Sequence, residues 1–282
     1  MHLCTLRRGS AGVIRPAAVA TIVLIITFSL IGDSGSGARV ELLMAGTPYE
    51  TPLFVLDSGE AGAVVLVLGG VHGNEPGAWM AAEALLKRGP PERGTLLIVP
   101  RANKLAVEAG LRSTPELGDL NRLYFSAPDL FPMAGMASEI VAVTARHEVE
   151  VVLDMHESWD FHRPNTGEVV LSALGQTISP HLSEPSRRLA RHLVGASNSR
   201  LHRTERFNYH EFPEGHVDAL IVPLPPGVDE RDVPRKSGMD IPEAVPGAAS
   251  ILVEVGQQQP LGRRVAQQVT IAVTLLEILS DE

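Results

Sequence analysis

The sequence predicts an α/β fold, with a mostly parallel or mixed central sheet and helices on both faces. Continuous apolar runs rich in β-branched residues recur along the chain, and such runs are typical of strands buried on both faces of a sheet. Segments with a helical pattern separate these runs, which favours βαβ connections. The chain has 282 residues, of which 44% are hydrophobic and 20% charged, so it can form one substantial buried core.

The individual elements are predicted in order from residue 40 onward. Residues 40–44 and 53–56 are expected to form a short antiparallel pair. The buried strands of the sheet are predicted at 63–68, 95–99, 149–154 and 251–255. The helices are predicted at 76–87, 136–147, 186–193 and 264–279. Between 157 and 249 the sequence is rich in Pro, Gly, His and charged residues, which indicates long loops of a functional or mobile kind.

The N-terminal segment has the pattern of a targeting sequence. Basic residues precede an uncharged apolar run at 16–32, and a stretch of small residues follows it up to Ala38. This order is typical of a secretory signal, and an uncleaved membrane anchor is the alternative. We therefore predict a signal peptide or N-terminal membrane anchor at 1–38 and one folded domain at 39–282. In either case the domain is expected outside the cytoplasm, secreted or held at the membrane by its N-terminal segment.

The charge and cysteine content of the chain exclude some kinds of partner and some kinds of metal site. Lys+Arg number 24 and Asp+Glu 33, and the resulting net charge of −9 has the wrong sign for a protein that binds a phosphate backbone. We therefore expect no nucleic-acid partner. The single cysteine, Cys4, allows neither an internal disulfide nor a thiolate metal cluster. Any bound metal must therefore rest on histidine and carboxylate ligands.

Ionisable residues lie at the ends of all four predicted buried strands. His72 and Glu75 follow the first, Arg101 follows the second, His156 follows the third, and Glu254 lies in the fourth. In parallel α/β sheets, ligands bind beyond the carboxyl ends of the strands. A single charge in such a position is commonly a solvated loop residue, but four strands that deliver such groups to one edge indicate a functional site.

A metal site is the best interpretation of this pattern. Two imidazoles and a carboxylate, from His72, Glu75 and His156, have the composition of a catalytic zinc site with an open fourth position. The alternative is that the glycine-rich stretch around His72 cradles a phosphate, but it lacks the P-loop Lys-Ser/Thr pair and the dinucleotide-binding glycine spacing. Asp154 has two interpretations, as a residue that orients a ligand histidine and as a strand-end cap. Glu157 is as well explained by a structural role as by a functional one.

The ordered motifs of the chain resemble those of the succinylglutamate desuccinylase/aspartoacylase family, within the wider zinc carboxypeptidase group. The motifs are GGVHGNEPGAW, PRANKLA, DLNRLYF, DMHES and VEVGQQQPLG, and the resemblance extends from about residue 63 to 265. It implies a zinc carboxypeptidase-like fold and one zinc ion per chain. The aspartoacylase branch carries a further C-terminal β-rich domain, whereas here one helix follows the last motif, so a single catalytic domain is expected.

The resemblance also implies roles for individual residues. It gives His72, Glu75 and His156 as the zinc ligands. Glu254 resembles the general base that takes a proton from metal-activated water and passes it to the leaving amine. Arg101 resembles the arginine that polarises the scissile carbonyl.

Two further residues are implied at the substrate. Asn121 and Arg122 resemble the pair that binds the free carboxylate of the substrate, for which a guanidinium fork has the right geometry. We therefore expect an exported zinc-dependent amide hydrolase, an N-acyl amino acid deacylase that acts next to a free carboxylate. The alternative is a metallocarboxypeptidase that trims short peptides such as cell-wall stem peptides. A zinc-binding protein without turnover is a minor alternative.

Overall fold

The computed structural model describes residues 37–162, 173–216, 219–220 and 222–281. The predicted targeting segment, apart from Gly37 and Ala38, lies outside the described residues. Within the described part of the chain, no helix combines the length and apolar character needed to cross a membrane.

One mixed sheet of eight strands forms the centre of the domain, in the order β1-β2-β4-β3-β5-β8-β6-β7. The strands are β1 (Gly37–Leu43), β2 (Thr51–Asp57), β3 (Val64–Leu68), β4 (Thr95–Val99), β5 (Val151–Ser158), β6 (Thr177–Pro180), β7 (Asn208–Tyr209) and β8 (Ala249–Gly256). The four central strands β4, β3, β5 and β8 are parallel. The antiparallel pairs are β1 with β2, β2 with β4, and β6 with β8. The predicted α/β class and mostly parallel sheet are confirmed.

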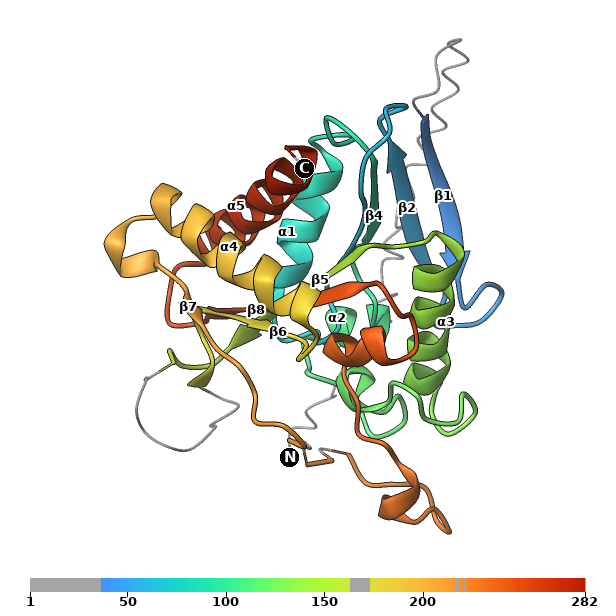
Figure 1. Cartoon of the computed structure of the whole chain (residues 1–282). Helices are drawn as coiled ribbons and strands as arrows, with labels where there is room; N and C mark the ends of the chain where they lie inside the picture. Colours follow the sequence, from blue (N-terminus) through green and yellow to red (C-terminus); the bar gives the residue numbers. More distant parts are fainter. Residues whose placement is uncertain (1–36, 163–172, 217–218, 221, 282) are drawn as a thin grey trace, which may run out of the picture. The chain divides into compact units, whose positions relative to one another are not determined.

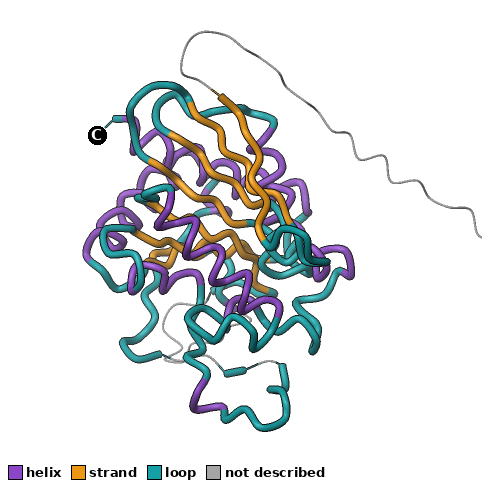
Figure 2. The backbone as a smooth tube through the Cα atoms, turned by 90° about the vertical axis from the view of Figure 1, so that its right-hand side faces the viewer, coloured by secondary structure: helices purple, strands orange, loops and turns teal. Residues whose placement is uncertain are grey.

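Helices cover both faces of this sheet, as Figure 1 shows. They are α1 (Pro76–Leu86), α2 (Lys104–Ala109), α3 (Pro132–Arg146), α4 (Glu184–Arg200) and α5 (Leu261–Ser280). One hydrophobic cluster joins residues of α1, α4 and α5 to one side of the sheet. A second cluster joins α3 and α2 to the other side, and Figure 2 shows the strands between these helical layers. The two clusters follow from the alternation of side chains along each strand.

The edges of several elements differ from the sequence predictions. The difference that bears on the site is in β5, which runs on to Ser158, so that His156 lies inside the strand and not after it. The reason is pairing: β8 bonds to β5 along its whole length, up to the match of Ser158 with Gly256. α3 begins at Pro132, four residues before the predicted start, and α2, β6 and β7 were not predicted. These short elements depend on long-range contacts that local patterns do not report.

Candidate metal centre and active-site cavity

His72, Glu75 and His156 come together at the carboxyl edge of the sheet. His72 lies in the loop after β3, Glu75 is the N-cap of α1, and His156 lies in β5. His72 Nδ1 is 2.7 Å from Glu75 Oε1, His156 Nδ1 is 3.0 Å from Glu75 Oε2, and the two Nδ1 atoms are 3.1 Å apart. All three residues are buried, and their donor atoms lie within 4.8 Å of one another.

The glycines around His72 allow close packing of the loop. A Cβ atom on Gly73 would lie 1.9 Å from the carbonyl oxygen of Ala106 in α2, so no larger residue fits there. Gly70 has a φ of 63°, in the left-handed region that favours glycine. The loop is therefore held against α2, and His72 takes a defined position beside Glu75.

Each of the two histidines has a carboxylate at its other ring nitrogen. His72 Nε2 is 3.2 Å from Asp119 Oδ1, and His156 Nε2 is 3.0 Å from Asp154 Oδ1. A histidine that ligates a metal through one nitrogen usually donates its other N–H to a carboxylate or carbonyl, which fixes the tautomer. In this arrangement both Nδ1 atoms face the Glu75 carboxylate.

The donor set fits a zinc ion. Ligands about 2.0–2.1 Å from one tetrahedral ion are separated by about 3.3 Å, close to the spacing of the donor atoms of His72, Glu75 and His156. Two imidazoles and a carboxylate are ligands that zinc accepts, although neutral histidine and carboxylate also bind Co, Mn or Ni. The structure therefore supports a candidate metal site made of His72, Glu75 and His156.

The charges around the site favour a cation at its centre. Burial alone would raise the pKa of the Glu75 carboxyl, but His72 and His156 outweigh burial and hold this pKa well below its usual range. Burial would also raise the pKa of Asp119, but His72 and two nearby arginines outweigh burial and lower this pKa. Burial lowers the pKa of His156, but Asp154 and Glu75 raise it well above its usual value. The buried carboxylates thus require positive charge between them, which a proton or a metal ion can supply.

Glu254 lies on β8 beside the candidate metal ligands. In the parallel register of β5 and β8 it is the direct partner of His156, so both side chains lie on the same face of the sheet. Burial raises the pKa of Glu254 to about 8, with further raising by Glu75 and Asp154 and opposition from His156 and Arg112. Its Oε2 atom has no hydrogen-bond partner among the described residues. A buried carboxylate oxygen without a partner lowers the stability of the fold, so its presence here indicates a functional role.

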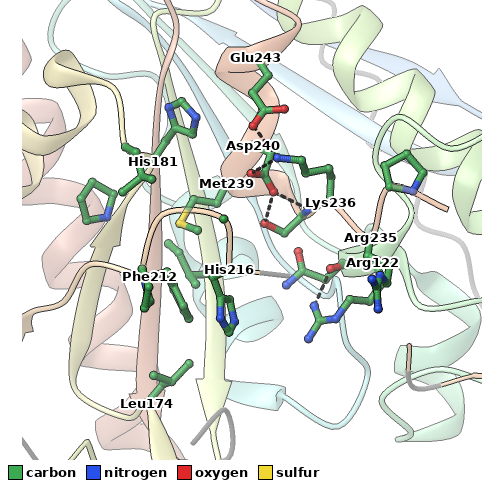
Figure 3. Close-up of a pocket in the computed structure, with 18 of the residues that line it drawn as sticks. Arg122, Leu174, His181, Phe212, His216, Arg235, Lys236, Met239, Asp240 and Glu243 are labelled. Atoms are coloured by element: carbon green, nitrogen blue, oxygen red, sulfur yellow. Dashed lines mark hydrogen bonds and ion pairs between the residues drawn. The ribbon is translucent and has the colours of Figure 1, made fainter. Parts of the chain in front are cut away.

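A cavity of about 390 Å³ opens above these residues. His72, Glu254, Asn121 and Arg122 all line it, so the structure brings the predicted substrate pair to the predicted metal centre. Figure 3 shows Arg122 on one side of the cavity and Phe212 on the other. The remaining wall includes polar and apolar side chains from the region that the sequence identified as long loops, among them Leu174, His181, His216, Lys236 and Met239.

Local hydrogen bonds hold the pair Asn121 and Arg122 in place. Asp119 accepts the backbone N–H of Asn121, in the short 3-10 helix Leu120–Arg122. Asn121 Oδ1 accepts the backbone N–H of Gly238, which ties this segment to a distant loop. Arg122 donates to the carbonyl oxygens of Asn121 and Ala219, at 2.6 Å and 3.4 Å. The guanidinium of Arg122 is therefore positioned before any substrate binds.

Arg101 is the predicted site residue that the structure does not bring to the cavity. Its guanidinium forms an ion pair with Glu83 at 2.7 Å and stacks over Trp79 at 4.7 Å, both on α1. The side chain is directed along α1, although its backbone follows a central strand. Arg112 lies at the site instead: it lines the cavity, donates to Asp119 at 3.0 Å and is 3.8 Å from Glu75 Oε1.

The sequence interpretation also missed Asp119. Its position two residues before Asn121, at the start of the DLNRLYF motif, was the available signal. Asp154, by contrast, was recognised, and its contact with His156 agrees with the interpretation that it orients a ligand. No signal in the sequence singled out Arg112, because it lies in a loop without strand or helix character.

The fold and the site together define an α/β domain with a buried two-histidine, one-carboxylate candidate metal centre at the carboxyl edge of its sheet. Residues 61–160 match the succinylglutamate desuccinylase/aspartoacylase catalytic domain, and the predicted resemblance to this family is confirmed over that stretch. No curated protein sequence matches the chain.

Solved structures with the same fold include members of more than one enzyme type. Tripeptide-bound cell shape determinant protein Csd4 of Helicobacter pylori superposes with a TM-score of 0.65 at 19% identity, over 81% of this chain and 55% of that one. A succinylglutamate desuccinylase/aspartoacylase of Rhodobacter sphaeroides gives 0.60 at 18% identity, over 88% and 66%. An aspartoacylase family protein of Mesorhizobium loti gives 0.56 at 21%, over 88% and 69%. The chain spans about half the length of the Csd4 structures, and identities this low show a shared fold alone.

Proposed function

We propose that the chain is a zinc-dependent amide hydrolase that removes an N-acyl group from an amino acid or a similar small carboxylate. One observation carries this proposal: a cavity of about 390 Å³ is lined by His72 of the metal centre, by Glu254 and by the pair Asn121 and Arg122. A metal centre, a base and a carboxylate clamp in one cavity are the parts needed to cleave an amide next to a carboxylate.

His72, Glu75 and His156 would hold the zinc ion. When bound, zinc supplies Lewis acidity and activates water for attack at neutral pH. The Arg122 fork binds the free carboxylate of the substrate and thereby places the amide next to Glu254. Glu254 takes up the proton released by the attacking water on a carboxylate oxygen and passes it to the nitrogen of the leaving amine.

We assign the stabilisation of the developing oxyanion to Arg112 in place of Arg101. The guanidinium of Arg112 lies on the cavity wall within 3.8 Å of Glu75, whereas Arg101 is bound to Glu83 outside the cavity. A cation placed where negative charge develops lowers the barrier more than it strengthens substrate binding.

A metallocarboxypeptidase that trims short peptides, cell-wall stem peptides among them, is the second candidate. It uses the same base and the same carboxylate clamp. One structural similarity favours it: the fold is shared with Csd4, which is described as a D,L-carboxypeptidase and has been solved with a tripeptide bound. The two functions differ in the leaving group that the cavity accepts.

The test combines metal content with a hydrolysis screen on the purified protein. The panel pairs N-acyl amino acids with short peptides that carry a free C-terminus, including stem peptides with D-residues. About one zinc per chain together with cleavage of acyl amino acids supports the deacylase, and peptide trimming alone supports the carboxypeptidase. Zinc uptake without any turnover would favour a binding protein, and no uptake would refute the metal site. His72→Ala serves as the metal-free control.

We also propose that the domain works outside the cytoplasm. The support is the sequence of residues 1–38, in which basic, apolar and small-residue stretches follow one another in the order of an export signal. Fusion of a reporter that is active only after export, such as alkaline phosphatase, tests this directly. A reporter that stays inactive when joined to the full chain would contradict the proposal.

A further inference from the structure

Glu157 lies next to the ligand His156 but on the opposite face of β5. Adjacent residues of a strand point to opposite faces, so Glu157 is directed toward α1 and α5, away from the cavity. Its side chain is fully buried. A buried carboxylate requires partners, and those of Glu157 connect three elements that meet behind the metal centre.

The first partner is the start of α1. Glu75 is the N-cap of this helix, but its side chain makes no capping hydrogen bond, because both carboxylate oxygens face His72 and His156. The N–H groups of the first turn need acceptors from elsewhere. Glu157 Oε2 accepts the backbone N–H of Gly77 at 2.9 Å and so replaces the missing cap. The negative charge of Glu157 also suits the positive end of the helix dipole.

The second partner is Arg264 of α5. Its NH1 atom donates to Glu157 Oε2 at 2.7 Å, and only 11% of its side chain is exposed. One turn further along the same helix, Gln268 donates to the carbonyl oxygen of His156 at 2.8 Å. α5 therefore holds the end of β5 at both His156 and Glu157.

The arrangement depends on a glycine at position 77. A Cβ atom there would lie 2.0 Å from Glu157 Oε1, so the carboxylate approaches the helix only because Gly77 has no side chain. A second hydrogen bond joins the same two segments, since the backbone N–H of Glu157 donates to Glu75 Oε2 at 3.0 Å. The Glu75 side chain therefore holds the backbone of β5 at Glu157, and the Glu157 side chain holds the backbone of α1 at Gly77.

We propose that Glu157 and Arg264 are positioning residues for the metal ligand Glu75. Glu157 caps α1 in place of Glu75, which leaves the Glu75 carboxylate free for the metal, and Arg264 neutralises the buried charge of Glu157. This role rests on the proposed metal site, since it concerns the placement of one of its ligands. It predicts that metal affinity depends on an acceptor for the Gly77 N–H, even though neither positioning residue touches the metal.

Two double variants of the full chain test this role. Glu157→Ala/Arg264→Met removes the buried ion pair and the acceptor for Gly77. Glu157→Gln/Arg264→Met also removes the ion pair but keeps an amide oxygen in place as acceptor. Zinc affinity is measured by competition with a chromogenic chelator, and the visible absorption of the cobalt(II)-loaded protein reports the geometry of the ligands.

We expect the first variant to bind zinc about 10–100-fold more weakly than wild type, the usual effect of losing support behind a metal ligand. The second should stay close to wild type in affinity and in cobalt spectrum. Arg263→Met is the matched control, because Arg263 neighbours Arg264 on α5 but pairs with Glu205 at 3.0 Å, away from the site.

The outcomes separate this role from the proposed function. Two folded double variants with wild-type zinc affinity would overturn the positioning role, and so would equal losses in both, because the acceptor would then not matter. Wild-type protein that takes up no zinc would instead overturn the metal site itself.

Discussion

Glu254 and His156 lie directly opposite each other on the neighbouring parallel strands β8 and β5. Strands in a sheet are about 4.8 Å apart, so this register places the candidate base beside a candidate metal ligand with little freedom for either backbone. β6 pairs with β8 on its other side, where Thr177 is the partner of Glu254. The candidate base therefore lies in the interior of the sheet, and a site on such a rigid element holds its geometry well.

Replacement of Glu254 by glutamine tests its role as the base. Glu254→Gln keeps the size of the side chain but cannot accept the proton from water, so we expect kcat to fall by about 10²–10⁴-fold. Metal content should stay at the wild-type level, since Glu254 is not a ligand. Turnover at the normal rate with zinc bound would show that another group acts as the base.

The raised pKa of Glu254 predicts a pH-dependent stability in protein stripped of metal. Burial raises this pKa to about 8 in the folded chain, against a usual value of 4.5. Between these values the folded state holds a proton that the unfolded state has released, so stability falls as pH rises from about 4.5 to 8. Glu254→Gln should lose this part of the pH dependence and be more stable than wild type at pH 8 but not at pH 4.

Urea denaturation of chelator-treated protein at several pH values measures this difference. A variant whose stability follows that of wild type in parallel across the whole range would contradict the raised pKa.

Replacement of Arg112 and replacement of Arg101 are expected to have different effects on catalysis. Arg112→Ala should lower kcat by about 10²–10³-fold with a smaller change in KM, as expected when a group that stabilises developing charge is removed. Arg101→Ala is the comparison, because its guanidinium contacts Glu83 and Trp79 on α1, outside the cavity. It should leave the kinetics nearly unchanged. A loss of activity in Arg101→Ala alone would restore the original assignment.

Arg122→Lys tests the carboxylate clamp. Lysine keeps the positive charge but loses the planar fork, and the loss of one charged hydrogen bond, about 1.5–3 kcal/mol, corresponds to a fall of about 10–100-fold in kcat/KM. The same variant should cleave a substrate with an amidated carboxylate as poorly as wild type does. Equal losses on both substrates would mean that Arg122 supports the cavity and not the substrate carboxylate.

Asp119→Asn tests the support behind His72. The contact of 3.2 Å between Asp119 Oδ1 and His72 Nε2 orients the ring, so the amide should weaken zinc binding by about 10–100-fold. Chelator competition measures this, with Asp57→Asn as control, since the carboxylate of Asp57 accepts a local bond from Gly59 at the end of β2. Unchanged zinc affinity in Asp119→Asn would refute the orienting role.

Much of the fold and part of the site could be predicted from local patterns. The four central strands were found because each contains a short apolar run, as is typical of a strand buried on both faces. His72 and Glu75 were found because they follow such a run in a loop. The end of β5 was placed too early, since the polar residues His156 to Ser158 broke the apolar pattern although the backbone continues as strand. Functional residues inside a strand are where pattern and structure are expected to disagree.

The sequence by itself determined the class of fold, the positions of the four central strands along the chain, and the candidate ligand set His72, Glu75 and His156. These depend on local hydrophobicity and on the rule that parallel strands end at one edge. Only the tertiary structure decided that Arg112 and not Arg101 faces the cavity, and that Asp119 and Asp154 support the two histidines. The direction of a long side chain depends on which partners it meets across the fold, here Glu83 for Arg101 and Asp119 for Arg112. A local sequence pattern cannot predict such partners, because each arginine meets its carboxylate only when the chain folds.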